Sequence, residues 1–196
     1  MQQQYLKQML SFARENKIPV ILDDTREYLE NLCKQLKPKK ILEVGTAIGY
    51  SASCMLLASN AEIVCFEASL PNIKLANENF KNLGLTNRVE IVVGDCLKTL
   101  PDYTGGKFDL IFLDGPKQMY KQIFDLLLPH LSMNGVMVID NVLFRGMVSD
   151  GKEITEPRYA RTVESLRNFI EYVQSKPELQ AEVKHIGDGL CVVKRI

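Results

Sequence analysis

The chain has 196 residues, of which 46% are hydrophobic, and it carries 24 acidic and 24 basic side chains. This length suits one domain with a full hydrophobic core, so we expect residues 1–196 to form a single domain. Its neutral charge argues against a protein that coats long nucleic acid, since such proteins are basic overall, although a local basic patch is compatible with it.

The cysteines and the N-terminal stretch indicate a reducing compartment. The five cysteines are irregularly spaced without a C-x-x-C pair, so we expect free, mostly buried thiols. The stretch MQQQYLKQML is polar and amphipathic, unlike a secretory signal. No apolar run reaches the roughly 18 residues that cross a bilayer. We therefore expect a cytoplasmic protein that does not associate with membranes.

The predicted elements alternate between helices and short apolar strands. Two helices, at about residues 3–15 and 24–36, precede the first strand. Five strands follow in chain order: KILEV, EIVCFEA, VEIVVGD, FDLIFLDG and GVMVIDN. The helical patterns between them are YSASCMLLA, LPNIKLANENFKNLG, a short DCLKTL and KQMYKQIFDLLLPHL. In the second of these, we expect Ser69 to cap the N-terminus and Gly84 the C-terminus.

The C-terminal part of the chain has a different pattern. A helical stretch over residues 159–174 precedes two β-rich runs, AEVKHI and LCVVKRI, which Gly187-Asp188-Gly189 separates. Glycines supply the positive φ angles of a tight turn, so a β-hairpin is predicted. Near-continuous apolar strands that alternate with helices indicate a parallel sheet covered on both faces. The predicted fold is α/β: a doubly wound, mainly parallel, seven-stranded Rossmann-like sheet with an antiparallel C-terminal hairpin.

Acidic residues end all of the first five predicted strands: Glu43, Glu67, Asp95, Asp114 and Asp140. Ligands of such sheets bind beyond the carboxyl ends of the strands. Capping of the following helix is the ordinary explanation for any single acid. Capping alone explains five such acids poorly, because carboxylates that share one edge of a sheet repel each other. A cationic ligand at that edge explains them better.

The first strand leads into the turn E-V-G-T-A-I-G-Y-S, in which Gly45 and Gly49 have a G-x-x-x-G spacing. The glycine patterns that bind pyrophosphate or triphosphate are missing, which disfavours phosphate-rich cofactors. S-adenosylmethionine carries a sulfonium and an ammonium group and suits an acidic edge. Its ribose diol suits Glu67, which lies 18 residues beyond Gly49, near the usual offset of a ribose-binding acid.

Oxygen-bearing side chains end the fourth and fifth strands: Asp114, and then Asp140 with Asn141. These strand ends lie either side by side or across the switch point, so the three side chains can converge. Without His or Cys, such ligands favour Mg²⁺, Mn²⁺ or Ca²⁺ over zinc, and Mg²⁺ is our first choice. The alternative is that Asp140 and Asn141 only begin a turn.

Lys117 follows Asp114 by three residues and is the predicted general base. A lysine near a metal at the edge of a sheet can have its pKa lowered, which base catalysis requires. The alternative is a solvated lysine at the start of a helix.

Four segments of the chain resemble the metal-dependent O-methyltransferases of the catechol and caffeoyl-CoA type: ILEVGTAIGYS, LDGPK, IDNVLFRG and IGDGLCVVK. The similarity runs from about Ile18 to the C-terminus. Within that family, IPV, GTAIGYS and DNVLFRG look most like the bacterial tRNA 5-hydroxyuridine methyltransferases. The resemblance implies a class I methyltransferase fold and a homodimer, and we expect the N-terminal helices within residues 1–37 to cover the site.

The resemblance also implies roles for individual residues. It implies contacts to S-adenosylmethionine from Ile21, Glu43, Gly45, Ser51, Glu67, Asp95 and Asp114, with Ile21 near the methionine end. It implies metal ligation by Asp114, Asp140 and Asn141, and base catalysis by Lys117 beside Asp114.

Two segments depart from the pattern of the family. Where the family has Pro-Ile-Met and an acid, this chain has Pro19-Val20-Ile21-Leu22, so that Asp23 is the candidate for the acid. Where the family often has two alanines before the lysine, this chain has Gly115-Pro116.

The predicted reaction moves a methyl group from sulfur to a substrate oxygen while the metal holds two neighbouring substrate oxygens. A catechol or caffeoyl group offers such a pair. So does 5-hydroxyuridine at the tRNA wobble position, whose methylation gives 5-methoxyuridine. Mostly on the resemblance, we favour the tRNA anticodon stem-loop as substrate and partner. The same kind of sheet is also compatible with a non-catalytic binding module or a nicotinamide dehydrogenase, although the missing G-x-G-x-x-G disfavours the dehydrogenase.

Basic residues follow the fifth strand, where substrate is expected to arrive: Arg145, Lys152, Arg158, Arg161 and Arg167. They are candidates for contacts to RNA phosphates, Arg145, Arg158 and Arg161 above all. The alternative is a mixed solvated surface, because the acidic residues Asp150, Glu153, Glu156 and Glu164 lie among them.

Overall fold

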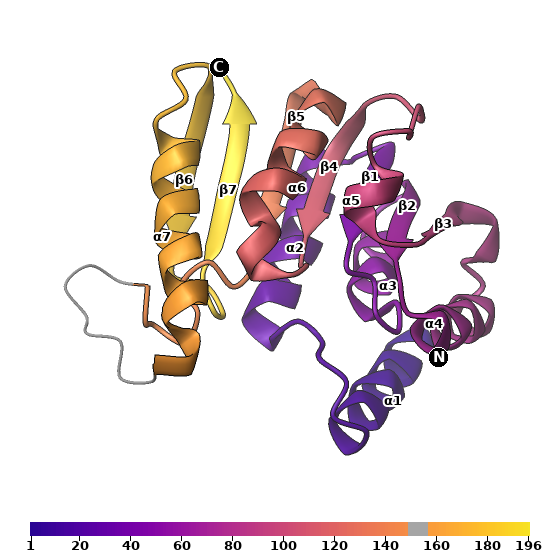
Figure 1. Ribbon diagram of the computed structural model, residues 1–196. Coiled ribbons are helices and arrows are strands. Elements are labelled where there is room, and N and C mark those ends of the chain that lie inside the picture. The colour runs from indigo at the N-terminus through magenta and orange to yellow at the C-terminus, as the bar shows by residue number, and fades with distance from the viewer. Residues whose placement is uncertain (149–156) are drawn as a thin grey trace.

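The computed structural model of the protein describes residues 1–148 and 157–196. Within these residues, seven strands form one sheet in the order β3-β2-β1-β4-β5-β7-β6 (Figure 1). The first five strands pair in parallel, and β7 pairs antiparallel with both β5 and β6. The predicted doubly wound sheet with its antiparallel C-terminal hairpin is therefore confirmed.

The elements follow one another as the sequence pattern predicts. The strands are β1 (Lys40–Val44), β2 (Glu62–Glu67), β3 (Val89–Val93), β4 (Phe108–Leu113), β5 (Leu131–Ile139), β6 (Leu179–Lys184) and β7 (Leu190–Arg195). The α-helices are α1 (Gln2–Glu15), α2 (Asp23–Leu36), α3 (Tyr50–Leu57), α4 (Leu70–Leu83), α5 (Cys96–Thr99), α6 (Tyr120–Leu127) and α7 (Ala160–Gln174). Short 3₁₀ turns include η2 (Lys117–Met119), η3 (Leu128–His130) and η4 (Pro157–Tyr159).

Both faces of the sheet are buried, which explains why its strands are apolar along most of their length. Successive residues of a strand point to opposite faces. On one face, Ile41 and Leu110 belong to the core that α1 to α4 complete. On the other, Leu42 and Ile111 belong to the core under α5, α6 and α7. Figure 1 shows α6 and α7 in front of the sheet and α2 behind it.

The predicted caps of α4 are confirmed. The hydroxyl of Ser69 accepts a hydrogen bond from the backbone N–H of Asn72 at 3.4 Å, and Pro71 lies in the first turn. Gly84 ends the helix with a left-handed φ of +72°. These local signals set both ends of the helix that packs beside the turn after β1.

The segment KQMYKQIFDLLLPHL differs from the single helix that its pattern suggests. It forms η2, then α6, then η3. Pro129 lies in the first turn of η3, and since proline lacks an N–H and clashes with the preceding helical turn, α6 ends before it. The fifth strand also begins earlier than predicted, at Leu131, which pairs with Phe108 across an irregular register.

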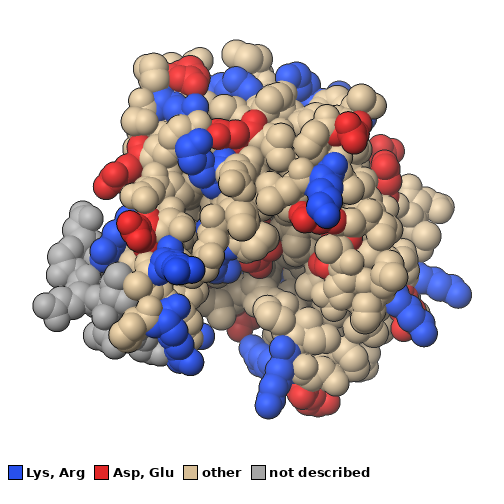
Figure 2. Space-filling view, viewed as in Figure 1, with Lys and Arg blue, Asp and Glu red and all other residues tan. Residues whose placement is uncertain are grey.

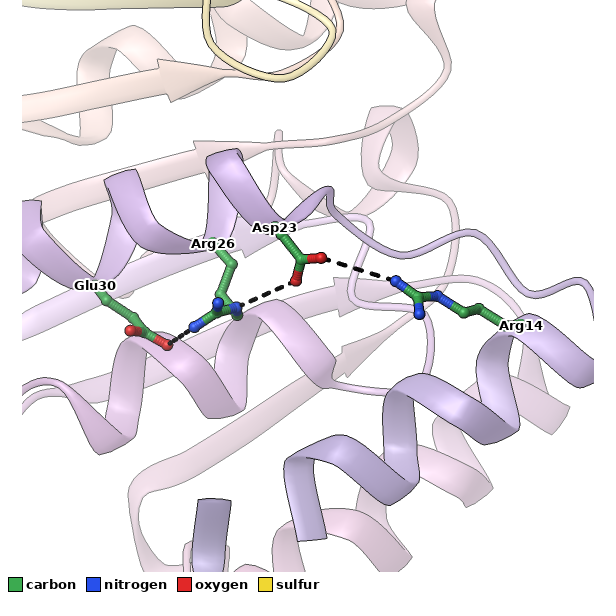
Figure 3. Close-up of polar contacts among 4 residues, drawn as sticks. All are labelled: Arg14, Asp23, Arg26 and Glu30. Carbon is green, nitrogen blue, oxygen red and sulfur yellow. Dashed lines mark hydrogen bonds and ion pairs between the residues drawn. The ribbon is translucent and has the colours of Figure 1, made fainter. Parts of the chain in front are cut away.

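The two N-terminal helices are joined by a chain of ion pairs (Figure 3). Asp23 at the start of α2 lies 3.8 Å from the guanidinium of Arg14 and 3.7 Å from that of Arg26, which in turn contacts Glu30 at 3.1 Å. The side chain of Asp23 is 64% exposed, and exposed pairs contribute little to stability. Of these pairs, the one between Arg14 and Asp23 links α1 to α2.

The prediction of free, buried thiols is confirmed, because all five cysteines are buried and none forms a disulfide. Burial raises the pKa of Cys33, Cys54 and Cys191 to about 12, so these thiols stay protonated at neutral pH. Among the helices that the structure describes, none is long and apolar enough to cross a bilayer.

Candidate active site

The turn after β1 lies in close contact with the end of β4 and with a side chain of α4. Gly45 has a φ of +91°, and a Cβ atom there would lie 1.8 Å from the carbonyl oxygen of Asp114. At Gly49, a Cβ atom would lie 2.7 Å from the ring of Phe80 in α4. The G-x-x-x-G spacing therefore marks two positions at which any side chain would push β4 or α4 away from the turn.

Glu43, near the end of β1, is completely buried and ties the strand to α3. The hydroxyl of Ser51 donates a hydrogen bond to Glu43 Oε1 at 2.6 Å, and the thiol of Cys65 lies 3.6 Å from Oε2. Burial raises the pKa of the Glu43 carboxyl to about 7, and the negative charge of Asp114 acts in the same direction. Glu43 and Ser51 are both predicted to contact the cofactor, and the structure shows that they are hydrogen-bonded to each other.

Glu67, at the end of β2, connects two turns. Its carboxylate oxygens accept hydrogen bonds from the backbone N–H groups of Ala47 and Ser69, each at 2.8 Å. A carboxylate has about four lone-pair sites, so further acceptor capacity remains for a ribose diol. The position of Glu67 is therefore fixed by the protein and still suits the role that the sequence predicts.

A cavity of about 290 Å³ lies where these strand ends meet. Its lining includes Gly45, Glu67 and Asp95, with Gly115 and Pro116 from the turn after β4. Figure 2 shows the surface hollowed at this end of the sheet, with acidic side chains inside. The cavity thus brings together three of the predicted cofactor residues.

Asp95 also has the ordinary role of a strand-end acid. Its side chain caps α5 by accepting a hydrogen bond from the backbone N–H of Leu97 at 3.0 Å. Ile21, the predicted neighbour of the methionine end, is buried in the core that the N-terminal helices share with the sheet. Its contact to the cofactor stays a prediction.

The ends of β4 and β5 lie side by side and bring two carboxylates together with a lysine. The backbone N–H of Asp140 donates to the carbonyl of Leu113 at 2.9 Å, which continues the ladder between the strands. Lys117 Nζ lies 3.8 Å from Asp114 Oδ1, and both side chains are about one quarter exposed, at 23% and 26%. The hydroxyl of Tyr120 donates to the backbone carbonyl of Asp140 at 2.9 Å and fixes the strand end.

Asp140 is 1% exposed, and its charge is costly to bury. Burial raises the pKa of its carboxyl to about 7, and the negative charge of Asp114 contributes in the same direction. Burial also raises the pKa of Asp114, against the opposing charge of Lys117. The charge of Asp114 thus makes ionisation of Asp140 less favourable, and a cation beside them would offset that cost.

Asn141 has a left-handed φ of +58°, and its backbone N–H donates to Asp140 Oδ1 at 2.6 Å. The turn that the sequence offered as the alternative is therefore present. Within the described residues, no three His, Cys, Asp or Glu side chains come together as metal ligands. A divalent cation here would depend on two carboxylates, the amide of Asn141, water and substrate. Such an oxygen-only set fits Mg²⁺.

Three of the candidate arginines lie near or beyond the end of β5. Arg145 donates from its guanidinium to the hydroxyl of Tyr159 at 3.2 Å and lies 5.4 Å from the centre of that ring. Arg158 lies 4.6 Å from the same ring centre. Arg161 is exposed on α7. Tyr159 was not among the candidates from the sequence, although its position beside Arg158 was a signal for cation–π stacking.

The remaining two basic candidates have different outcomes. Arg167 donates to the backbone carbonyls of Met147 at 3.1 Å and Val148 at 3.4 Å, so it holds the chain after β5 against α7. Lys152 lies outside the described residues, together with the interleaved acids Asp150, Glu153 and Glu156.

This sheet order, with acidic strand ends around a cavity, defines a class I methyltransferase. Two solved structures share the fold closely. An O-methyltransferase from Bacillus cereus in complex with SAH is 25% identical, with a TM-score of 0.86 over 98% of this chain and 91% of that one. An SAH-bound methyltransferase from Podospora anserina is 26% identical, with a TM-score of 0.84 over 98% and 88%.

The chain belongs to the O-methyltransferase family, whose profile matches residues 1–196. A catechol O-methyltransferase from Niastella koreensis is 30% identical over 181 residues, which cover 86% of this chain and 79% of that protein. Caffeoyl-CoA O-methyltransferase 1 from Arabidopsis thaliana is 24% identical over 184 residues, or 88% and 70%.

The protein is an S-adenosylmethionine-dependent O-methyltransferase with relatives of the catechol and caffeoyl-CoA type, as the sequence predicts. This sets aside the binding module and the dehydrogenase. The closer similarity to tRNA 5-hydroxyuridine methyltransferases stays a prediction.

We expect Glu43 to make the unliganded protein less stable as pH rises. Its pKa is raised from 4.5 to about 7, so the folded state holds a proton that the unfolded state releases between these values, and stability falls over that interval. The loss amounts to about 3 kcal/mol. In the Glu43→Gln variant, this part of the pH dependence disappears, which urea unfolding at pH 4.5 and pH 8 with chelator measures. Equal pH dependence in both proteins would contradict the assignment.

Proposed function

We propose that this enzyme is a Mg²⁺-dependent O-methyltransferase that methylates one of two neighbouring oxygens on its substrate. The observation that carries the proposal is the convergence of Asp114, Lys117 and Asp140 at the adjacent ends of β4 and β5. The buried carboxylate of Asp140 and the partly buried one of Asp114 beside a lysine cost free energy that an apolar strand end would not, which favours a ligand-binding role in addition to the turn at Asn141.

The cofactor is proposed to occupy the cavity at the ends of β1, β2 and β3. S-adenosylmethionine supplies an electrophilic methyl group next to a positive sulfur, which suits a carboxylate-lined site. Its proposed contacts are Ile21, Glu43, Gly45, Ser51, Glu67, Asp95 and Asp114. Within this set, Glu67 accepts the ribose diol, and the N-terminal helices within residues 1–37 cover the methionine end.

The proposed metal ligands are Asp114, Asp140 and Asn141. A bound Mg²⁺ supplies Lewis-acid chemistry, which lowers the pKa of the substrate hydroxyl and orients it. The buried position of Asp140 supports this proposal, since its carboxylate accepts a hydrogen bond from the backbone N–H of Asn141 and is shielded from water.

Lys117 is proposed to take the proton of the substrate hydroxyl. As the substrate oxygen forms its new bond to the methyl carbon, the bond from that carbon to sulfur breaks and S-adenosylhomocysteine leaves, while the proton of the substrate hydroxyl passes to the lone pair of Lys117 Nζ. Asp114, at 3.8 Å, then stabilises the ammonium group that results. Lys117 thereby holds the proton close to the site and away from the leaving sulfur.

A small molecule with vicinal oxygens on an aromatic ring is the first candidate substrate. The catechol and caffeoyl-CoA O-methyltransferases among the relatives support it. The sequence had favoured tRNA, and 5-hydroxyuridine at the wobble position remains the second candidate. The observation in its favour is the group formed by Arg145, Arg158 and the partly buried Tyr159, because cations and an accessible aromatic edge suit phosphates and bases. The homodimer and the cytoplasmic location stay predictions.

We expect the Lys117→Gln variant to lose catalysis while it keeps substrate binding. Removal of a general base lowers kcat by roughly 10²–10⁴-fold, with little change in KM. Steady-state kinetics measures both constants. The matched control is Lys121→Gln in α6, because the side chain of Lys121 is 57% exposed and forms its ion pair with Asp125 on the same helix. A kcat for Lys117→Gln equal to that of the control would remove Lys117 from the mechanism.

Metal removal and the Asp140→Asn variant are expected to have the same effect. Chelation abolishes methyl transfer and Mg²⁺ restores it, whereas Asp140→Asn no longer binds Mg²⁺ in calorimetry. In the wild type, Mg²⁺ affinity falls as pH decreases below about 7, because a proton then competes for Asp140. Asp102→Asn, in an exposed turn, serves as the control. Full activity of Asp140→Asn in chelator would refute the metal site.

The two candidate substrates are separated by direct comparison. The enzyme is supplied with S-adenosylmethionine, Mg²⁺ and either a catechol or tRNA bearing 5-hydroxyuridine, and products are identified by mass. We expect rapid methylation of the catechol, with little dependence on salt or on Arg145, Arg158 and Arg161. A rate that is higher on tRNA, falls steeply with salt and decreases when these arginines are changed to alanine would favour the second candidate instead.

A further inference from the structure

The turn between β6 and β7 contacts two parts of the molecule that do not belong to the hairpin. The sequence explains Gly187-Asp188-Gly189 as a tight turn, and the backbone N–H of Gly189 does close it on the carbonyl of Ile186 at 2.9 Å. The side chain of Asp188 has no part in that bond. Its contacts lie on the loop after β5, which carries Asn141.

That loop has an unfavourable backbone conformation. Asn141, Phe144 and Arg145 have φ angles of +58°, +42° and +58°, in the left-handed region that residues with a Cβ atom rarely adopt. Three such residues within five persist only where surrounding contacts hold them, and such sites are frequently functional.

The hairpin turn supplies those contacts. The backbone N–H of Val142 donates to the carbonyl of Gly189, and that of Leu143 donates to the carbonyl of Asp188, both at 3.0 Å. The backbone N–H of Arg145 donates to the carboxylate of Asp188. A hydrogen bond to a carboxylate is stronger than one between neutral groups. Three of the loop's N–H groups are therefore held by two residues of the turn.

The turn is itself fixed from both sides. A Cβ atom on Gly189 would lie 2.4 Å from Cγ of Leu143, so the loop packs directly on the turn. A Cβ atom on Gly187 would lie 2.5 Å from the hydroxyl of Thr25, which is fully buried in α2. The turn is thus packed between α2 on one side and the loop on the other, which limits any movement of the turn away from the loop.

We propose that Asp188 is a positioning residue of the active site, which holds the loop so that Asn141 and Arg145 stay at the end of β5. This inference rests on the proposed function for the roles of these two residues. Asp188 touches neither substrate nor metal. It acts through the N–H of Arg145 and through the backbone of Leu143, and its removal leaves the strained loop without its charged anchor.

Hydrogen exchange in metal-free protein tests the anchor directly. In Asp188→Ala, the amide of Arg145 loses its acceptor, and we expect the peptide covering 141–148 to exchange roughly tenfold faster or more. Asp188→Asn keeps a side-chain carbonyl and restores most of the protection. Asp102→Ala, the same chemical change in an exposed turn, leaves exchange unchanged. Protection of the β6 and β7 amides shows that each variant is folded.

The catalytic consequence has its own readouts. We expect Asp188→Ala to bind Mg²⁺ more weakly and to have a lower kcat, with an unchanged KM for S-adenosylmethionine, and Asp188→Asn to recover both. Unchanged exchange in the loop overturns the proposal, as does faster exchange with normal Mg²⁺ binding and normal kcat. A wild type that neither binds Mg²⁺ nor transfers methyl groups refutes the proposed function, whereas faster loop exchange in Asp188→Ala still supports the anchor.

Discussion

The burial of negative charge at the carboxyl edge of the sheet is the constraint on which the site depends. Asp140 is almost inaccessible to water beside Asp114, and both carboxyl groups have raised pKa values because of that burial. The sheet can hold them there because β4 and β5 are adjacent and parallel, so that consecutive strand ends meet. The fold thus holds two carboxyl groups where ionisation is unfavourable, and the packing of the strands on both faces keeps them there.

The sequence predicted the elements that depend on local pattern. Near-continuous apolar runs identified the strands, glycine and serine identified the ends of α4, and the acids after the strands identified the edge at which the cavity lies. Patterns of this kind report which side a residue faces and where an element stops. They failed where a single residue overrides the period, as Pro129 does after α6.

The contacts missed from the sequence join residues that lie far apart in the chain. Nothing local shows that Glu43 accepts a hydrogen bond from Ser51, that Arg145 reaches Tyr159, or that Asp188 reaches the loop after β5. The strand-end acids could be located but their partners could not. For Asp95 the ordinary capping role was correct, whereas Glu67 joins two turns at once. The strand order and the strand register determine which distant residues become partners. Local sequence patterns narrow the possible orders and registers but do not specify one of them.

The last strand lies inside the sheet, because β7 is inserted between β5 and β6. The strand β5 therefore lacks its antiparallel neighbour in any chain in which residues 190–195 are missing or unpaired. The hydrogen bonds from the turn to the strained loop belong to the same hairpin. A chain that lacks those residues would still contain the cofactor half of the sheet, and yet it would lack the support that shapes the catalytic half. Competence for methyl transfer is thus expected to require β7, although that strand carries none of the proposed ligands.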